Sequence, residues 1–540
     1  MQVLLASGIG SVVFQRQLAA QVAAGGEITE AMLAEAEWVA GISLTEPERE
    51  TIAKSLTETL RDFQELRKIP VDYRVSPAFH FAPLTAEPLI KVEAREEVAV
   101  SESALSRPVS NEDLAFLPVA SLSRLVRTRK VTSLELTRLY LGRLKRYDEV
   151  LKCVVNLTED LALQQAARAD EEIAAGRYRG PLHGIPWGAK DLIACAGYPT
   201  TWGAAFYEDQ QFGHTATVVD KLNAAGAVLV AKLTTGALAE GDQWFGGMTR
   251  NPFFPEQGSS GSSAGPASAV AAGLVGFAIG SETLGSIVSP CIRCRATGLR
   301  PTFGRVSRYG CMPLSWTMDK LGPIARSVED CAIVFEAIHG ADGKDAAAAT
   351  RPFQWPVKSE IKGMRVGYFE GRDEDALEIL RDLGATLLPI DLPGRQLANQ
   401  LASMLSIEAA AAFDEVTAAG ITDAHGFNRW KERFQRMRFV SAVDYIRANR
   451  LRSVLMEDVA RATSQVDAWI GGDDLVVTNL TGHPTVVLPH GAWEISSDEP
   501  RRLRSRSITF TGQPYADDSL LALGAAFQAK GDAHLQRPSL

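Results

Sequence analysis

The chain has 540 residues, 46% of them hydrophobic and 22% charged, and a formal net charge of −9. This composition is typical of a folded globular protein and excludes a disordered, fibrous or coiled-coil chain. An acidic chain without a basic block has no electrostatic footprint for nucleic acid or an anionic membrane surface, so we expect neither partner. The one basic cluster, from Arg501 to Arg506, follows two acidic residues and is interpreted as a solvated loop.

The cysteines and histidines do not form a metal-binding pattern. Six cysteines in a chain of this length are too sparse for a disulfide framework, so we expect reduced thiols. Cys291 and Cys294 form an isolated CxxC motif without a second pair or neighbouring histidines, which a zinc site would need. The sequence therefore predicts no metal and no cofactor.

The first residues allow two interpretations. Met1 to Phe14 is apolar and uncharged, and the small residues Ala19 and Ala20 follow. This is the length of the apolar region of a signal peptide, but no basic residue precedes it. Residues 1–20 are therefore either a truncated signal peptide of an exported protein or a packing helix of a cytoplasmic one, and we favour the cytoplasmic location. No segment has the length and apolar character of a membrane-spanning helix.

An N-terminal helical extension is predicted over residues 1–105. Thr45 to Glu48 has the sequence of a capping box with a proline in the first turn, which predicts a helix up to about Arg67. Its apolar face is formed by Ile52, Leu56, Leu60, Phe63 and Leu66. Four prolines between residues 70 and 88 then interrupt regular structure, and residues 106–540 are predicted to form the main domain.

The main domain has the pattern of an α/β protein. A second capping box, Thr132 to Glu135, predicts a helix whose apolar face contains Leu136, Leu139, Tyr140 and Leu144. Short β-like runs then alternate with alanine-rich helical segments. The predicted strands are 227–230, 364–369, 386–392, 475–477, 485–488 and 508–510, and residues 405–465 are predicted to be helical. This pattern favours a mixed, twisted sheet covered by helices on both faces.

The most unusual segment runs from Gly258 to Ser286 and has the sequence GSSGSSAGPASAVAAGLVGFAIGSETLGS. Glycine and serine crowd both ends, and an alanine-rich helical stretch lies between them. Glycines allow a backbone to approach a ligand closely, and serines at such turns place hydroxyl groups beside exposed N–H groups. A nucleophile next to backbone donors is what acyl transfer requires.

One alternative for the nucleophile comes from a short motif. Gly261 to Gly265 matches G-x-S-x-G, the nucleophile elbow, which would make Ser263 the nucleophile. An elbow follows directly on a central strand, whereas the preceding residues 251–257 contain two prolines. In this alternative, His483 or His490 would be the base, and Asp467 or Asp473 would be the acid. We disfavour this alternative.

A lysine in an apolar segment suggests a different base. Residues 181–192, PLHGIPWGAKDL, place Lys190 in a glycine-bounded apolar run. If Lys190 is buried, its charged form is disfavoured and the neutral amine can accept a proton from a serine. His183 in the same segment is expected to be a packing residue.

These segments together resemble the amidase signature family. Residues 184–191 match its motif G-I-P-x-x-x-K-D, and the Gly/Ser segment matches its signature from Gly261 to Pro290. Residues 298–307, GLRPTFGRVS, are close to G-L-K-P-T-x-G-R-V-S, and Asp319 and residues 322–326 also fit. The resemblance extends from about residue 110 to the C-terminus and implies the amidase signature fold.

The resemblance implies a Ser-cisSer-Lys triad. Lys190 would be the base, Ser262 the bridging serine that follows a cis peptide bond, and Ser286 the nucleophile. The oxyanion hole would be formed by the backbone N–H groups of Thr283, Leu284 and Gly285, together with that of Ser286. Family loops in the region of residues 241–247 line the substrate cleft, so Trp244 and Phe245, with Gly261, are candidate substrate-binding residues.

Two positions depart from the family pattern. The turn reads Glu282-Thr-Leu-Gly-Ser where the family usually has D-x-G-G-S, and Val288 stands where it usually has arginine. In some members that arginine binds a substrate carboxylate or pairs with the acid of the turn. Val288 therefore predicts a preference for neutral acyl groups, and Arg293 or Arg295 could take over the ionic role.

The expected function is hydrolysis of a small-molecule carboxamide through an acyl-enzyme. Three alternatives stay open: the amidase subunit of a tRNA-dependent amidotransferase, a serine esterase or carbamate hydrolase using the same site, and a non-catalytic binding module on this fold. Because dimers are common in the family, a homodimer is the candidate assembly.

Overall fold

The computed structural model describes residues 26–70, 79, 105–356, 361–419, 428–472, 474–491, 494–495 and 503–540. The chain divides into two compact units. The first contains residues up to 81 together with 313–317 and 392–462, and the second contains 82–312, 318–391 and 463–540. The predicted signal-peptide remnant, and nearly all of the proline-rich stretch, lie outside the described residues.

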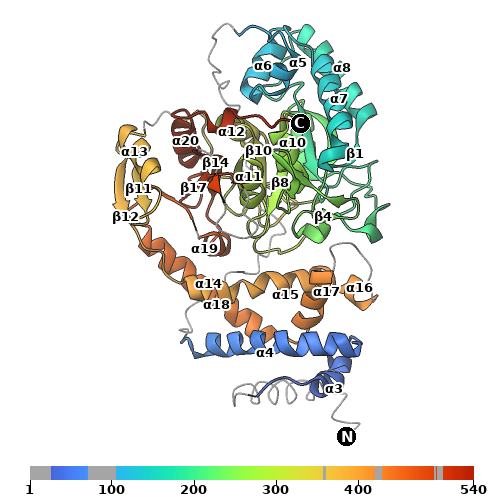
Figure 1. Cartoon of the computed structure of the whole chain (residues 1–540), viewed down its shortest axis with the longest axis vertical. Helices are drawn as coiled ribbons and strands as arrows, with labels where there is room; N and C mark the ends of the chain where they lie inside the picture. Colours follow the sequence, from blue (N-terminus) through green and yellow to red (C-terminus); the bar gives the residue numbers. More distant parts are fainter. Residues whose placement is uncertain are drawn as a thin grey trace. The chain divides into compact units, whose positions relative to one another are not determined.

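The second unit is built on one large mixed sheet (Figure 1). Its eleven strands are β1 (Val154–Leu157), β2 (Pro186–Lys190), β3 (Val228–Leu233), β8 (Phe277–Glu282), β9 (Thr297–Arg300), β10 (Lys320–Ala325), β11 (Arg365–Tyr368), β12 (Thr386–Pro389), β13 (Ala468–Ile470), β14 (Thr485–Pro489) and β17 (Ser507–Gly512). They lie in the order β1-β3-β2-β8-β10-β9-β14-β17-β13-β11-β12. The parallel pairs are β2 with β3 and β8, and β11 with β12 and β13.

Three two-stranded ribbons complete the described strands. They are β4 (Gln243–Trp244) with β5 (Gly247–Met248), β6 (Arg250–Asn251) with β7 (Phe254–Gly258), and β15 (Glu494–Ile495) with β16 (Leu503–Arg504).

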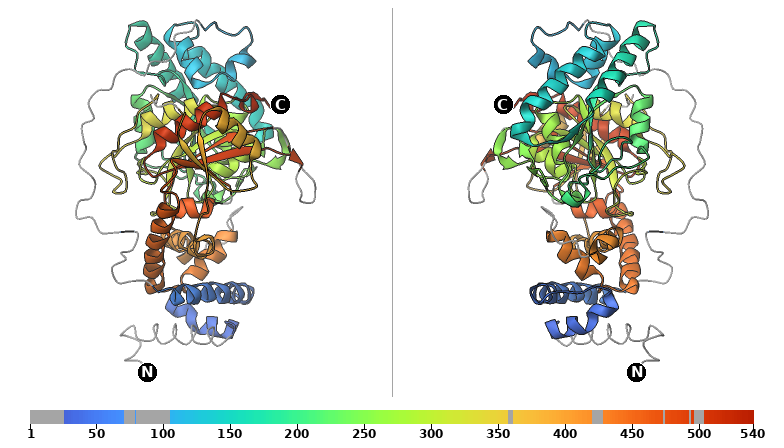
Figure 2. Two further views of the ribbon diagram at one scale, coloured as in Figure 1. Left: turned by 90° about the vertical axis from the view of Figure 1, so that its left-hand side faces the viewer. Right: turned by 90° about the vertical axis from the view of Figure 1, so that its right-hand side faces the viewer.

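Helices cover both faces of this sheet, as predicted. They are α5 (Asn111–Ala115), α6 (Val119–Arg127), α7 (Ser133–Leu151), α8 (Glu159–Ala174), α9 (Thr217–Ala224), α10 (Ala264–Ala271), α11 (Val288–Cys294), α12 (Val328–Ile338), α13 (Glu374–Asp382), α19 (Leu475–Leu480) and α20 (Asp517–Gln528), with short 3₁₀ turns at Ala205–Tyr207, Ala237–Ala239 and Ala533–Leu535. Residues of α7, α8, α10 and α11 share one apolar core with β3. Helices α12 and α20 contact each other and the strands β9, β10, β14 and β17. Figure 2 shows the helices of residues 111–174 side by side at one end of this unit.

The first unit is helical. It contains α3 (Glu30–Ala40), α4 (Glu46–Lys68), α14 (Arg395–Leu401), α15 (Ser403–Ala412), α16 (Asp414–Ala418), α17 (Asn428–Met437) and α18 (Ala442–Ala462). The capping box at Thr45 and Glu48 is present, and the five apolar residues predicted to face the core are buried. Helix α4 contacts α17 and α18, and the Arg67 guanidinium binds both carboxylate oxygens of Asp444. The N-terminal helices therefore share a unit with a later segment of the chain.

Most predicted elements of the main domain are confirmed. The strand–helix–strand pattern between residues 364 and 392 is β11, α13 and β12, with the two strands parallel. The prediction of a strand at 475–477 is wrong, because these residues begin helix α19. A short apolar run cannot be assigned to helix or strand by periodicity alone. None of the described helices is long and apolar enough to cross a membrane.

Candidate active site

Lys190 is the last residue of β2, which lies between β3 and β8 in the sheet. Its side chain is 0% exposed. The Nζ atom lies 2.7 Å from Ser262 Oγ, 2.9 Å from Ser281 Oγ and 3.1 Å from Ser263 Oγ. Burial lowers the pKa of Lys190 well below that of a free lysine, although the carboxylates of Asp319 and Glu282 act in the opposite direction. A neutral amine within reach of three serine hydroxyls can act as a base.

The residue before Ser262 lies in close contact with a second segment of backbone. The Gly261–Ser262 peptide bond is cis, and the Ser262 side chain is buried. A Cβ atom on Gly261 would lie 1.9 Å from the backbone oxygen of Gly241, so only glycine fits at this position. The loop that contains Gly241 therefore packs directly against the residue before Ser262.

The hydrogen bonds around Lys190 distinguish Ser263 from Ser262. Ser263 Oγ donates its proton to Ser281 O at 3.0 Å and accepts the Ser281 N–H at 3.1 Å. Its remaining contact with Lys190 must therefore be as an acceptor. Among the described residues, Ser262 Oγ contacts only Lys190 and has its proton available. Ser262 can thus donate to the lone pair of a neutral Lys190.

Ser286 lies in the turn between β8 and α11 and is partly exposed. Its backbone oxygen accepts the Ser263 N–H at 3.0 Å, which joins this turn to the segment that contains Ser262. Within the described part of the chain, neither Ser262 nor another residue forms a hydrogen bond with Ser286 Oγ, and no protein acceptor is found for the N–H groups of residues 283–286. The turn therefore presents a hydroxyl group and consecutive N–H donors without protein partners.

Two acidic residues, the buried Glu282 and the partly exposed Asp319, bind residues of this turn or next to it. Glu282 is fully buried, and its contact with Arg300 is an ion pair of 2.9 Å. Burial alone would raise the pKa of Glu282, but the charges of Arg300 and Lys320 and backbone N–H donors lower it to about 2. The Thr283 hydroxyl donates to Asp319 Oδ1 at 2.6 Å. This lowered pKa keeps the carboxylate of Glu282 ionised at neutral pH.

The candidate substrate-binding aromatics differ in exposure. Trp244 is 8% exposed and packs edge to face against Phe245, with ring centroids 4.8 Å apart. A Cβ atom on Gly246 would lie 2.3 Å from the Trp244 ring, which places that ring over the turn of its own ribbon. Phe245 is partly exposed. Of the two, Phe245 is the one with surface left to contact a ligand.

The geometry gives no support to the nucleophile elbow. Residues 254–258 do form a strand, β7, but it pairs only with β6 and not with the central sheet. Ser263 is buried, and its hydroxyl is fully hydrogen-bonded. His483 donates to or accepts from Thr481 Oγ1, and burial lowers its pKa to about 3. His490 binds Asp375 at 2.9 Å, so neither histidine contacts Ser263. Of the proposed acids, Asp467 pairs with Arg365, and Asp473 lies outside the described residues.

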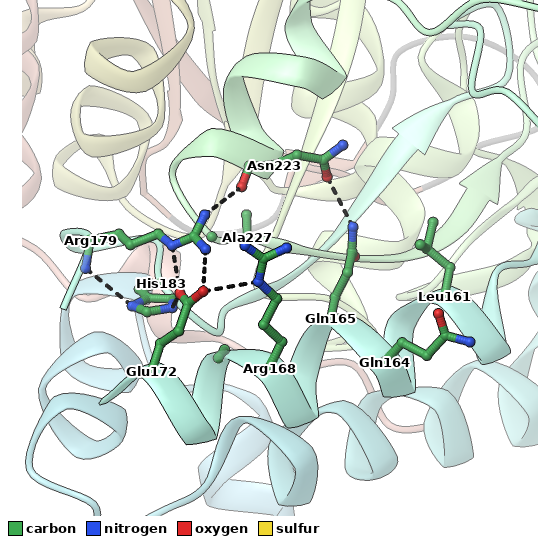
Figure 3. Close-up of a pocket in the computed structure, with 11 residues that line it drawn as sticks. Leu161, Gln164, Gln165, Arg168, Glu172, Arg179, His183, Asn223 and Ala227 are labelled. Atoms are coloured by element: carbon green, nitrogen blue, oxygen red, sulfur yellow. Dashed lines mark hydrogen bonds and ion pairs between the residues drawn. The ribbon is translucent and has the colours of Figure 1, made fainter. Parts of the chain in front are cut away.

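His183 lies in a polar cluster that contains none of the predicted catalytic residues (Figure 3). Its Nδ1 atom accepts the Arg179 N–H, and its Nε2 atom lies 3.2 Å from Glu172 Oε2. Glu172 also pairs with Arg168 and Arg179, which lower its pKa to about 2. These residues line a pocket of about 350 Å³ beside the C-terminal end of α9. His183 thus positions the segment that leads into β2.

The side chain at position 288 does not face the turn. Val288 is 1% exposed and belongs to the apolar core. The expectation of a preference for neutral acyl groups stays a prediction. Arg295 binds the backbone oxygens of Gly491 and Ala533, so it does not reach Glu282. The ionic partner of Glu282 is Arg300, which no sequence motif assigned to the site.

Three further residues at the site were not predicted from the sequence. Ser281 contacts Lys190 directly, Asp319 binds Thr283, and Asn479 Nδ2 donates to Glu282 Oε1 at 2.8 Å. Ser281 and Asp319 lie within the matched motifs and could have been chosen by their chemistry. Asn479 lies in helix α19, which was predicted to begin as a strand, and no sequence signal connects it to the turn.

Comparisons with known proteins agree with this fold. The family model Amidase matches residues 135–471. A glutamyl-tRNA(Gln) amidotransferase subunit from Chloroflexus aurantiacus is 32% identical over 493 residues, which cover 79% of this chain and 99% of that protein. The solved peptide amidase of Stenotrophomonas maltophilia is 29% identical, with a TM-score of 0.68 over 78% of this chain and 98% of its own. A bacterial aryl acylamidase, 21% identical with a TM-score of 0.68, shows likeness of fold alone.

The fold and these comparisons thus define a hydrolase of the amidase signature type. The chain belongs to the amidase family, whose members act on carbon–nitrogen bonds.

Proposed function

We propose that this protein hydrolyses a small-molecule carboxamide through an acyl-enzyme on Ser286. The observation that supports this most directly is the buried Lys190 amine, 2.7 Å from the hydroxyl of Ser262. Among the described residues, no carboxylate contacts this amine, and serines surround it. Burial favours the neutral form of such a lysine, which can then accept a proton.

In the proposed reaction, the same groups act once in the acylation of the enzyme and once in its deacylation. Lys190 accepts the proton of Ser262, and Ser262 accepts that of Ser286 as Ser286 Oγ attacks the amide carbon. The free N–H groups of Thr283, Leu284 and Gly285 stabilise the negative charge on the former carbonyl oxygen. The proton returns along the same path to the leaving amine. Water then enters, gives up a proton by the same route and releases the acid from Ser286.

The test is a set of simple amides with detection of the released amine, together with labelling by a fluorophosphonate. We expect Ser286→Ala to abolish labelling and to lower kcat by at least about 10⁴-fold, since the nucleophile is lost. Ser262→Ala should lower kcat by about 10²–10⁴-fold, the range for loss of a general acid–base group. Label on Ser263, or full activity in Ser286→Ala, would exclude this mechanism. Esters and carbamates in the same substrate set test whether the protein is instead an esterase or a carbamate hydrolase.

A second candidate function is supported by the relatives themselves. Several are subunits of glutamyl-tRNA(Gln) amidotransferases that match this chain over 96–100% of their own length. In such an assembly, this chain would generate ammonia from an amide for use by a partner. Hydrolysis by the purified chain at the same rate with and without candidate partner proteins would favour the stand-alone enzyme. The homodimer remains a prediction that sedimentation can check.

A further inference from the structure

We propose that Glu282 and Arg300 form a positioning pair that fixes the oxyanion turn of residues 283–286. This inference rests on the proposed function, because it assumes that the N–H groups of this turn stabilise the charge formed at the substrate oxygen. Neither residue touches the reacting atoms; both act through the turn.

Glu282, which precedes the turn, binds the backbone that follows the turn. Its Oε2 atom accepts the N–H groups of Ile287 at 2.8 Å and of Val288 at 3.0 Å. These are the two residues directly after the nucleophile and the start of α11. A single carboxylate oxygen thus joins both ends of the segment that contains the nucleophile and the four free N–H groups.

The other carboxylate oxygen joins this turn to the sheet. Oε1 accepts Nη1 of Arg300 at 2.9 Å and Nδ2 of Asn479 at 2.8 Å. Arg300 ends β9, and its Nη2 atom donates to Thr485 Oγ1 at the start of β14 and to His483 O two residues before it. Glu282 and Arg300 are each 0% exposed. The position of the turn is therefore determined by two central strands and not by the loop alone.

Every hydrogen-bonding neighbour of Glu282 is a donor. The carboxylate meets two backbone N–H groups, a guanidinium and an amide N–H, and four acceptor sites match four donors. Glutamine has the same shape but would direct its NH₂ group at donors, whichever way the amide is turned. At least one hydrogen bond of the network must then break, and a buried donor that is left unsatisfied costs free energy.

The experiment compares Glu282→Gln with a matched buried pair elsewhere in the same unit. Asp517 is fully buried, binds the N–H and hydroxyl of Thr302, and lies 3.5 Å from Arg305. Asp517→Asn therefore disturbs a similar network that contains no residue of the proposed site. Each variant is assayed for kcat and KM on an amide, for inhibition by the matching trifluoromethyl ketone, and for folding by circular dichroism.

We expect Glu282→Gln to lower kcat and the affinity for the ketone by about 10²–10³-fold, the range for loss of an oxyanion donor, with KM changed less than about threefold. Asp517→Asn should leave both values within about threefold in the folded fraction. Equal effects in the two variants, or an unchanged ketone affinity in Glu282→Gln, would overturn the inference.

Arg300 variants provide an independent measurement if Glu282→Gln does not fold. In Arg300→Met the carboxylate loses its cation, so its pKa rises, and the acid limb of the kcat profile, which Lys190 sets in the wild type, should become steeper because a second group titrates. Arg300→Lys keeps the charge and should restore most of the wild-type slope. Identical pH profiles of kcat in Arg300→Met and in the wild type would contradict the proposed role of the pair. An inactive wild type that no fluorophosphonate labels would instead contradict the proposed function.

Discussion

Replacing Lys190 with methionine should change how the stability of the protein depends on pH. Methionine has nearly the same length and fits an apolar site, but it carries no proton. In the native state Lys190 is fully buried and its pKa is lowered well below the ordinary value, whereas in the unfolded chain it returns to about 10.4. Between these two values, the unfolded wild type binds one more proton at this residue than the native protein does.

The sign and size follow from proton linkage. Where the unfolded state binds more protons, the free energy of unfolding rises with pH, by about 1.4 kcal/mol per pH unit for one proton. The methionine variant lacks this contribution. Over about 1.5 pH units within this window, the free energy of unfolding of the wild type should therefore gain about 2 kcal/mol relative to Lys190→Met. At the acid end of the window the variant should be the more stable of the two, because it buries no amine.

Urea unfolding of both proteins at several pH values measures this difference. Tryptophan fluorescence and circular dichroism must give coincident transitions, because the chain has two compact units and a free energy is defined only for a cooperative transition. The hydrogen bonds to the serines that the variant loses change its free energy of unfolding by a constant amount. They therefore do not affect the slope of that free energy against pH. Parallel curves for wild type and variant would show that Lys190 is protonated in the native state and would refute its role as a neutral base.

Three other outcomes can be checked with less effort. Gly261→Ala should abolish activity and destabilise the fold, since its Cβ would lie 1.9 Å from a backbone oxygen, while Gly213→Ala, with nothing within 4 Å, should be neutral in activity and thermal melting. His490→Ala should keep the acid limb of the pH–rate profile, because the limb belongs to Lys190; its disappearance would point to a histidine base. Phe245→Ala should raise KM for an aromatic amide while Trp244→Ala mainly lowers the melting temperature, because only Phe245 keeps exposed surface. Equal KM values in the two variants would remove Phe245 from the substrate site.

The parts of the fold that the sequence predicted are those with a strong local signal. The capping box at Thr45 and the apolar spacing that follows it were enough to place helix α4, because both depend on residues within one helix. The run Leu475-Val476-Val477 gave the wrong element, since three apolar residues fit a strand as well as the first turn of a buried helix. The strand order of the sheet depends on contacts far apart in sequence and could not be derived from periodicity.

The candidate site was predictable where a motif contains the reacting group. Lys190 and Ser262, which contact each other in the structure, come from motifs 72 residues apart. The network of Glu282, Arg300 and Asn479 was not predicted, because Arg300 was interpreted only as part of a matched motif and Asn479 belongs to no motif. Such supporting contacts depend on which buried acceptors meet which donors, and that is decided by the tertiary structure.

The contact between Gly261 and Gly241 has a consequence for how this scaffold can diversify. The backbone of the loop is held against the residue before Ser262 with no room for a methyl group, so its path cannot change without moving Ser262. Gln243 and Phe245 in this loop keep exposed or partly exposed side chains, whereas Asp242 binds the Ser260 N–H and Trp244 is buried. Directed evolution for new amides should therefore accumulate substitutions at positions 243 and 245, whereas insertions or deletions in the same loop should be eliminated.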